Sequence, residues 1–167
     1  MRPTVLAVID LKKTDAAVVD ATRTATAANG ARIVLLHVAP PVSLPATPNS
    51  RREQVCWGRM AAADEAAQRV LRRLAARRLP RHADVLTTVR FGDVVEQVGR
   101  AAISVDATLV VAATGPARWL WGRGRDRRLR RSLDVPVFLV PARGDAVDGH
   151  RTARPESSRA SRQRSAA

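Results

Sequence analysis

The stretch that decides the fold runs from Ala107 to Pro141 and reads ATLVVAATGPARWLWGRGRDRRLRRSLDVPVFLVP. Two continuous apolar runs, at 109–113 and 135–140, enclose a loop and a basic segment that we expect to form a short helix over 126–133. Continuous apolar runs are typical of strands buried on both faces, as in a parallel sheet. The stretch therefore predicts strand, loop, helix and strand, which is the repeating unit of an α/β fold.

The same alternation continues toward the amino terminus. Three further apolar runs predict strands over 5–9, 33–38 and 85–89. Between the strands, helices are predicted over 15–28 (before Asn29-Gly30), over 51–79 (before Pro80), and from the N-cap Asp93 to about 103. This order predicts a single α/β domain with a doubly wound, five-stranded parallel sheet and helices on both faces.

The long segment 51–79 has a helical pattern of apolar residues. They recur every three or four positions, which predicts one face packed on the sheet; they are Cys56, Met60, Ala63, Ala67, Val70 and Leu74. Trp57 is expected to lie partly buried on the flank of this face.

Composition favours a folded cytoplasmic protein. The 167 residues are enough for one domain, and 46% of them are hydrophobic. No apolar run is long enough for a membrane span, and the first residues do not have the pattern of a signal peptide. The single cysteine, Cys56, excludes an internal disulfide and fits a reducing compartment. We therefore expect a cytoplasmic location and no membrane partner.

The net charge of +14 has two interpretations. Of the 29 basic residues only Lys12 and Lys13 are lysines, and this arginine bias is compatible with ordinary solvated surface charge. The alternative is a surface selected to attract nucleic acid or an acidic protein. Residues 142–167 are rich in Arg, Ser, Ala and Gly and nearly lack large apolar residues, so we expect a disordered basic tail after a domain of residues 1–141.

Open α/β sheets bind ligands beyond the carboxyl ends of their strands, where the strand order reverses. Asp10 ends the first predicted strand, and Ala113, Thr114 and Gly115 end the fourth. The Asp10 carboxylate could accept hydrogen bonds from a sugar hydroxyl, help to hold a metal, or cap the following helix.

Four segments together resemble the universal stress protein family: VLAVID (5–10), ARIVLLHVAPP (31–41), FGDVVEQVGRAAISVDATLVVAATG (91–115) and DVPVFLVP (134–141). They lie in the order and at the separations of that family over about residues 1–141. The resemblance implies the strand order 3-2-1-4-5, a cytoplasmic protein, and commonly a homodimer joined through the last strand. It also implies that ATP is a possible ligand, since some members bind it and others do not.

The resemblance carries over to particular residues. It places Asp10 beside the nucleotide and the backbone of Val38 against adenine, and Gly92-Asp93 matches the turn into the third helix. Gly115 and Gly124 are present in the phosphate loop but are displaced from the family positions, so both are weak candidates for nucleotide binding.

The phosphate loop also departs from the family pattern. Two glycine positions fall on Ala113 and Pro116, and Leu11-Lys12 replace a usual Gly-Ser. Glycines let backbone N–H groups approach phosphate oxygens closely, whereas proline has no N–H to donate. The departures predict a degenerate, weak or absent adenine-nucleotide site.

Arginine and tryptophan side chains stand where that loop is expected. The guanidinium groups could hold phosphate oxygens in place of the backbone, or could form the charged face of a surface helix; they are Arg118, Arg123, Arg125, Arg127, Arg128, Arg130 and Arg131. Trp119 and Trp121 could stack on a base, pack over the end of the sheet, or lie at a dimer contact.

No pattern of catalytic or metal-binding residues stands out. The chain lacks a Walker-type phosphate loop and any Cys/His metal spacing, and Cys56 lies on the apolar helix face. We therefore expect no enzyme and no metal, but a cytoplasmic protein that acts by binding in a stress response. The alternative is a basic module that binds nucleic acid or an acidic partner through residues 118–131 and the tail; a slow nucleotide hydrolase is the third hypothesis.

Overall fold

The computed structural model describes residues 2–11, 14–43, 50–114 and 123–141. Within them the elements follow one another as β1 (Thr4–Val8), α1 (Asp15–Ala27), β2 (Arg32–Ala39), α2 (Arg51–Arg78), β3 (Val85–Phe91), α3 (Val94–Ser104), β4 (Leu109–Ala113), α4 (Arg123–Ser132) and β5 (Val137–Val140). Gly115, Pro116, Arg118, Trp119, Trp121 and the expected tail lie outside the described residues.

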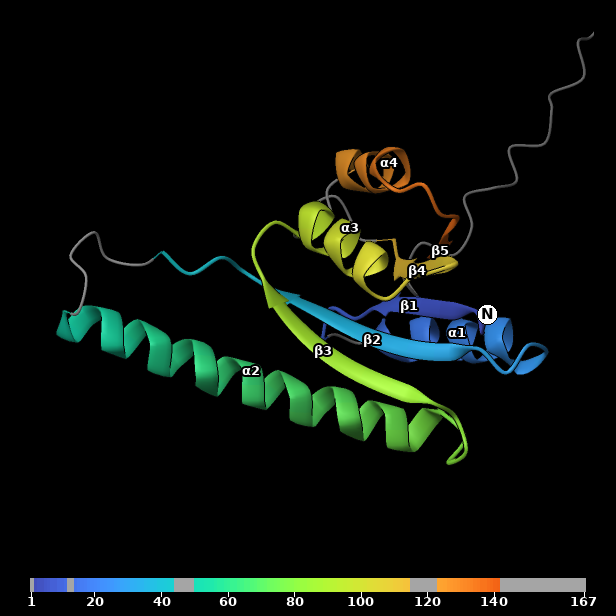
Figure 1. Cartoon of the computed structure of the whole chain (residues 1–167), viewed down its shortest axis with the longest axis horizontal. Helices are drawn as coiled ribbons and strands as arrows, with labels where there is room; N and C mark the ends of the chain where they lie inside the picture. Colours follow the sequence, from blue (N-terminus) through green and yellow to red (C-terminus); the bar gives the residue numbers. More distant parts are fainter. Residues whose placement is uncertain (1, 12–13, 44–49, 115–122, 142–167) are drawn as a thin grey trace, which may run out of the picture.

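The five strands form one parallel sheet in the order β3-β2-β1-β4-β5. Helices α3 and α4 cover one face of this sheet, while α1 and α2 lie on the opposite face (Figure 1). The predicted doubly wound fold and its strand order are confirmed.

Strand β1 lies at the centre, and all five of its residues are buried. Successive side chains of a strand point to opposite faces, so Leu6 and Val8 enter the core beneath α3 and α4, and Val5 and Ala7 enter the core beneath α1 and α2. Because β1 serves two cores, its residues Val5 to Val8 are all apolar and its sequence does not alternate.

Helix α2 contacts the sheet through a face that partly overlaps the predicted one. Of the six predicted residues, Ala67 is buried and Cys56, Met60 and Leu74 are half-buried. Only Ala67 and Leu71 are buried on it, whereas Val70 is 44% exposed and Ala63 is exposed. Trp57, expected to be partly buried, is 51% exposed. In Figure 1 the amino-terminal end of α2 projects beyond the sheet, so the apolar residues there have little to pack against.

Local signals fix most helix ends. The Asp93 carboxylate accepts hydrogen bonds from the N–H groups of Val95 (3.0 Å) and Glu96 (3.1 Å), which confirms it as the N-cap of α3. Ser50 caps α2 through the N–H of Glu53 at 3.2 Å. After α1 the chain turns at Gly30, whose φ of 55° is a left-handed conformation that favours glycine.

Two predicted boundaries in the last third of the chain were wrong. The last strand begins at Val137 rather than at 135, because Pro136 lacks an N–H and only its carbonyl joins the ladder, accepting from Val110 N–H at 2.9 Å. Helix α4 begins at Arg123 rather than at 126, which places Gly124 in its first turn.

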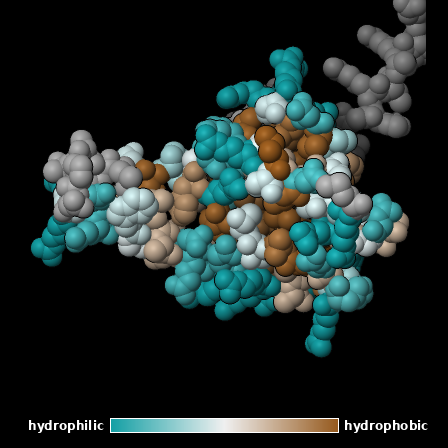
Figure 2. All heavy atoms as spheres, viewed as in Figure 1, coloured by the Kyte–Doolittle hydropathy of each residue, from teal (hydrophilic) through white to brown (hydrophobic). Residues whose placement is uncertain are grey.

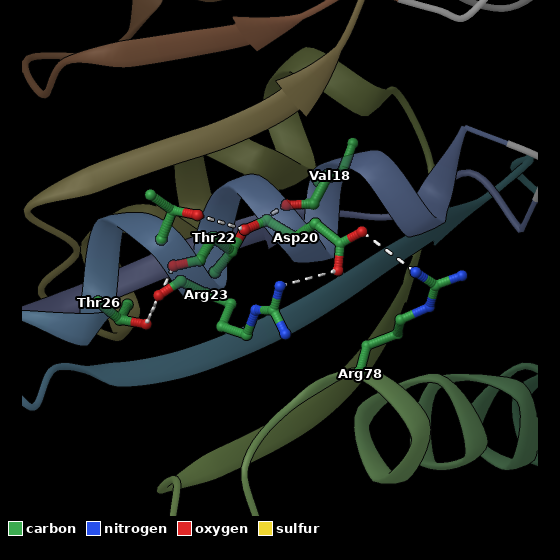
Figure 3. A network of polar contacts seen from close by, with 7 residues as sticks. Val18, Asp20, Thr22, Arg23, Thr26 and Arg78 are labelled. Atoms are coloured by element: carbon green, nitrogen blue, oxygen red, sulfur yellow. Dashed lines mark hydrogen bonds and ion pairs between the residues drawn. The ribbon is translucent and has the colours of Figure 1, made fainter.

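One ion pair links α2 to α1, and further polar contacts lie within α1 (Figure 3). The Arg78 guanidinium lies 3.1 Å from one carboxylate oxygen of Asp20, and Arg23 lies 3.9 Å from the other. The hydroxyls of Thr22 and Thr26, both buried, donate to carbonyls one turn earlier in α1 at 2.8 and 3.0 Å. These bonds satisfy polar groups that burial would otherwise leave without water. Among the described residues, no helix has the length and apolar character needed to cross a membrane.

Candidate functional site

The register of the sheet brings three predicted end-of-strand residues to one level. Asp10, Val38 and Thr114 each lie two residues beyond the level of Val8: Asp10 lies after β1, Val38 on β2 and Thr114 directly after β4. After β1 the chain continues to β2 on one side of it, and it later returns to β4 on the other side. The strand order therefore reverses at β1, and the three residues lie at the carboxyl end of the strands at that reversal. It is the place where open α/β sheets bind ligands.

Asp10 is half-buried at this edge, and its backbone N–H donates to Oδ1 of Asp15 at 3.0 Å. Asp15 is buried (6% exposed) in the first turn of α1, where the positive end of the helix dipole stabilises a carboxylate. The N-cap residue of α1 is Thr14, so the suggestion that Asp10 caps the helix is wrong. The loop is instead held by the next acidic residue.

His37 fixes the neighbouring strand end. Its ring Nδ1 lies 2.8 Å from the carbonyl oxygen of Ile9, and the Ile9 N–H donates to the carbonyl of Leu36, also at 2.8 Å. These contacts tie the residue before Asp10 to β2. Sequence reasoning missed both Asp15 and His37 as site residues; the only signal was their closeness in sequence to Asp10 and Val38.

Val38 offers only its backbone to a ligand at this edge. Its side chain is 9% exposed and packs in the same core cluster as Val94 and Val95 of α3. The turn that follows β3 is also present, since Gly92 has a φ of 135° and its N–H donates to the Ala39 carbonyl at 3.0 Å.

Two positions at which the resemblance implies glycine carry apolar side chains that join the core. Leu11 has a φ of 60°, a left-handed conformation that glycine adopts without the cost of a Cβ. Its side chain packs against the core cluster beneath α1 and α2, and Ala113, 8% exposed, belongs to that same cluster. The backbone at Leu11 thus has a glycine-type conformation, although the residue itself serves packing.

Thr114 directly follows β4, and its backbone N–H already has a hydrogen-bond partner on β5. Its N–H donates to the Val140 carbonyl at 2.7 Å, and its hydroxyl lies 3.3 Å from the same oxygen. Gly115, the next residue and a predicted nucleotide contact, lies outside the described residues.

Among the side chains of helix α4 that the structure describes, one is buried, that of Leu129. Leu129 is fully buried in the cluster that includes α3 residues, while the described arginines around it are exposed: Arg127, Arg128, Arg130 and Arg131. These four guanidinium groups form no ion pair with any other described residue. This part of the segment therefore has the arrangement of a charged face on a surface helix. Gly124, the other predicted glycine, is a first-turn helical residue here.

Metal-binding geometry is not found where the structure can be described. Over residues 2–11, 14–43, 50–114 and 123–141, no three His, Cys, Asp or Glu side chains are grouped as metal ligands would be. Cys56 is a free, half-buried thiol on α2.

Solved structures share this fold. A universal stress family protein from Burkholderia pseudomallei is 26% identical, with a TM-score of 0.57, over 83% of this chain and 96% of the other. A universal stress protein solved in complex with cAMP is 18% identical (TM-score 0.57; 84% and 97% covered). One from Archaeoglobus fulgidus, in complex with dAMP, is 14% identical (TM-score 0.51; 83% and 97% covered).

The sequence itself gives a consistent result. No curated protein matches it. The model of the universal stress protein family matches residues 1–141, which is most of the 167-residue chain and includes every described strand and helix. The chain therefore belongs to the universal stress protein family.

Proposed function

We propose that this chain is a cytoplasmic stress-response protein that binds an adenine nucleotide weakly at the edge formed by Asp10, Val38 and Thr114. The observation that carries this proposal is the shared level of these three residues at the reversal of the strand order. Relatives of the same fold have been solved with cAMP and with dAMP, which supports an adenine nucleotide as the ligand class.

Each residue has a distinct role in the proposed site. The Asp10 carboxylate accepts hydrogen bonds from the ribose hydroxyls, and the backbone of Val38 contacts the adenine. Asp15 and His37 are positioning residues, because they hold the peptide bond between Ile9 and Asp10: Asp15 accepts from its N–H, and the His37 ring contacts its carbonyl oxygen. ATP is one possible ligand among adenine nucleotides.

Weak affinity follows from the phosphate side of the site. Ala113 is buried in β4, and Pro116 has no N–H, so neither replaces the glycines that would let the backbone surround a phosphate. The Leu11 side chain is used in the core. We therefore expect the nucleoside part to contribute most of the binding and the phosphates to contribute little.

Calorimetric titration of ATP and AMP into the full chain tests this proposal. Saturable binding is expected for both, with dissociation constants within about tenfold of each other, since about 1.4 kcal/mol corresponds to that ratio. Asp10→Ala is expected to weaken binding at least tenfold, while Asp64→Ala on α2 is the remote control. No saturation at millimolar nucleotide, or equal binding by the two variants, would contradict the proposal.

We further propose that the role is binding without catalysis. Two described polar groups at this edge are engaged in positioning contacts: Nδ1 of His37 on the Ile9 carbonyl, and the Asp15 carboxylate on the Asp10 N–H. Phosphate release from ATP should therefore stay at the buffer rate. Turnover that is abolished by Asp10→Ala would instead establish the slow hydrolase.

The proposed assembly is a homodimer through β5. This edge strand pairs only with β4 among the described strands, and its Phe138 is 54% exposed. Sedimentation should show a dimer for the wild type and for the control Ile103→Asp, a residue that is 83% exposed on α3. Phe138→Asp should sediment as a monomer, and a monomeric wild type at high concentration would refute the interface.

The alternative, a basic module that uses α4, has one supporting observation. Its described arginines are exposed and free of ion pairs with other described residues. Salt-sensitive binding of nucleic acid that is lost when Arg127, Arg128 and Arg131 are replaced would favour this alternative.

A further inference from the structure

Helix α2 carries a concentration of positive charge that the proposed nucleotide site does not use. Residues 66–83, its carboxyl-terminal half and the turn after it, contain six arginines and no aspartate or glutamate. Figure 2 shows hydrophilic side chains gathered along the lower edge of the molecule, where Figure 1 places this part of α2.

Three of these arginines recur at every fourth residue along one side of the helix, and we call them the arginine ridge: Arg69, Arg73 and Arg77. Residues four apart advance by about 6 Å along a helix and drift by about 40° around it, so the ridge spans about 12 Å within one arc. All three side chains are exposed. Leu71 and Ala67, which face the sheet, are 0% and 5% exposed, so the ridge points away from the core.

Little in the described structure neutralises the ridge. Arg69 has one partner, Glu65, at 3.3 Å, and both side chains are largely exposed. Arg73 and Arg77 form no ion pair with another described residue. Exposed arginines without acidic neighbours are available for phosphate groups, which guanidinium binds in a bidentate manner.

We propose that the arginine ridge binds the phosphate backbone of duplex nucleic acid, without reading its sequence. Each strand of a duplex presents one phosphate per about 3.4 Å of the duplex axis, so a row with a charge about every 6 Å can engage several phosphates at once. The ridge has no aromatic side chain, which single-stranded binding would need for base stacking.

The packing of α2 argues against an anionic membrane as the partner. A helix that lies on a membrane buries an apolar face beside its basic one. The apolar face of α2 is already packed on the sheet through Leu71, and Val70 is the only large apolar residue between Arg69 and Arg77 that is exposed. The duplex backbone therefore fits the ridge better than a lipid surface does.

A structural role is the competing explanation, since arginines near a helix carboxyl end also stabilise the helix dipole. The test therefore measures both binding and folding. Fluorescence anisotropy of a labelled 20-base-pair DNA of arbitrary sequence is followed with the full chain between 50 and 200 mM salt. Circular dichroism on heating reports the stability of each variant.

The decisive variant replaces Arg69, Arg73 and Arg77 by Gln. It is expected to lose at least tenfold in affinity at 50 mM salt, and the slope of log K against log salt should fall by about 2.7, at about 0.9 per lost phosphate contact. The matched control changes Arg127, Arg128 and Arg131 of α4 to Gln. This control removes the same charge and should lose less than threefold.

Two further variants keep the proposal testable. The variant with lysine in place of all three ridge arginines should keep most of the affinity for DNA, because lysine keeps the positive charge that attracts the phosphates. Arg73→Gln with Arg77→Gln leaves the pair of Arg69 with Glu65 intact and should lower the slope by about 1.8 even if the triple variant is unstable. Nucleotide titration should be unchanged in all ridge variants, which separates this proposal from the proposed function.

Three results would overturn the proposal. One is no DNA binding by the wild type at 50 mM salt. Another is equal loss of affinity in the ridge and α4 variants, which would mean that only net charge matters. The third is a three-lysine variant whose melting temperature and DNA affinity are as low as those of the three-glutamine variant. This result would indicate a structural role for the guanidinium groups.

Discussion

Helices α3 and α2 cover opposite faces of the same sheet but are used very differently. Over its 11 residues α3 buries five side chains, whereas α2 buries two over 28 residues. Helix α3 lies directly over the core that contains Val38 at the candidate site. Helix α2 instead projects past the sheet at its amino-terminal end (Figure 1).

This contrast shows that helix length is a poor guide to a helix's contribution to stability. Burial of apolar area stabilises a helix in a protein far more than its own hydrogen bonds do. Most substitutions on α2 should therefore be tolerated, which leaves its surface free for contacts such as those proposed for the arginine ridge. Matched pairs of buried and exposed residues test this difference in burial between α3 and α2.

The largest effect is expected at Leu71, the one fully buried large side chain of α2. Leu71→Ala should lower the free energy of unfolding by about 3 kcal/mol, because it removes buried methyl groups and leaves a cavity. Leu86→Ala on β3, where the leucine is 48% exposed, is the control and should cost less than about 1 kcal/mol. Urea denaturation measures both. Equal losses would mean that α2 is not anchored at this residue.

An intermediate effect is expected from a valine on each helix. Val98 of α3 is fully buried, and Val70 of α2 is 44% exposed. Val98→Ala should cost about 2 kcal/mol, whereas Val70→Ala should be neutral or slightly stabilising, since alanine is the better helix former. The gain in helix propensity is the same in both, so the difference in urea midpoint isolates burial. A loss at Val70 as large as that at Val98 would contradict the comparison.

The two helices also differ in how well the sequence predicted them. The Asp93 cap and the apolar run 94–95 placed the start of α3 correctly. The face of α2 was predicted too far toward Val70 and away from Leu71, because alanines lie on every side of this helix and blur the apolar stripe. Periodicity alone could not tell which of two adjacent apolar residues faces the sheet; contact with the sheet decided it.

At the candidate site, position along the chain predicted Asp10 and the family resemblance predicted Val38, but neither predicted the residues that support them. The strand ends were readable because each follows an apolar run, and the parallel register brings them to one level. The contacts of Asp15 and His37 cross from one element to another, so they depend on that register and on the turn at Leu11. No local pattern encodes such contacts.

The smallest effect is expected at the helix caps, where the same contrast should reappear. Asp93 accepts two backbone N–H groups at the start of α3, and the next residues, Val94 and Val95, are buried. If the first turn of α3 unwound after loss of this cap, it would expose Val94 and Val95 to water. Asp93→Ala should therefore lower the free energy of unfolding by about 1 kcal/mol or slightly more. Ser50 caps the start of α2 through one N–H, and the residues that follow it, Arg51 and Arg52, are exposed.

The first turn of α2 can therefore open into solvent, and Ser50→Ala should cost only a few tenths of a kcal/mol, below the usual range for a lost cap. Urea midpoints of the two variants, with backbone hydrogen exchange at the start of each helix, measure the difference. Exchange near Glu53 should be fast even in the wild type. A cost at Ser50 equal to that at Asp93 would mean that the amino-terminal half of α2 is packed against something that stabilises it, and that the contrast between the two helices fails at that end.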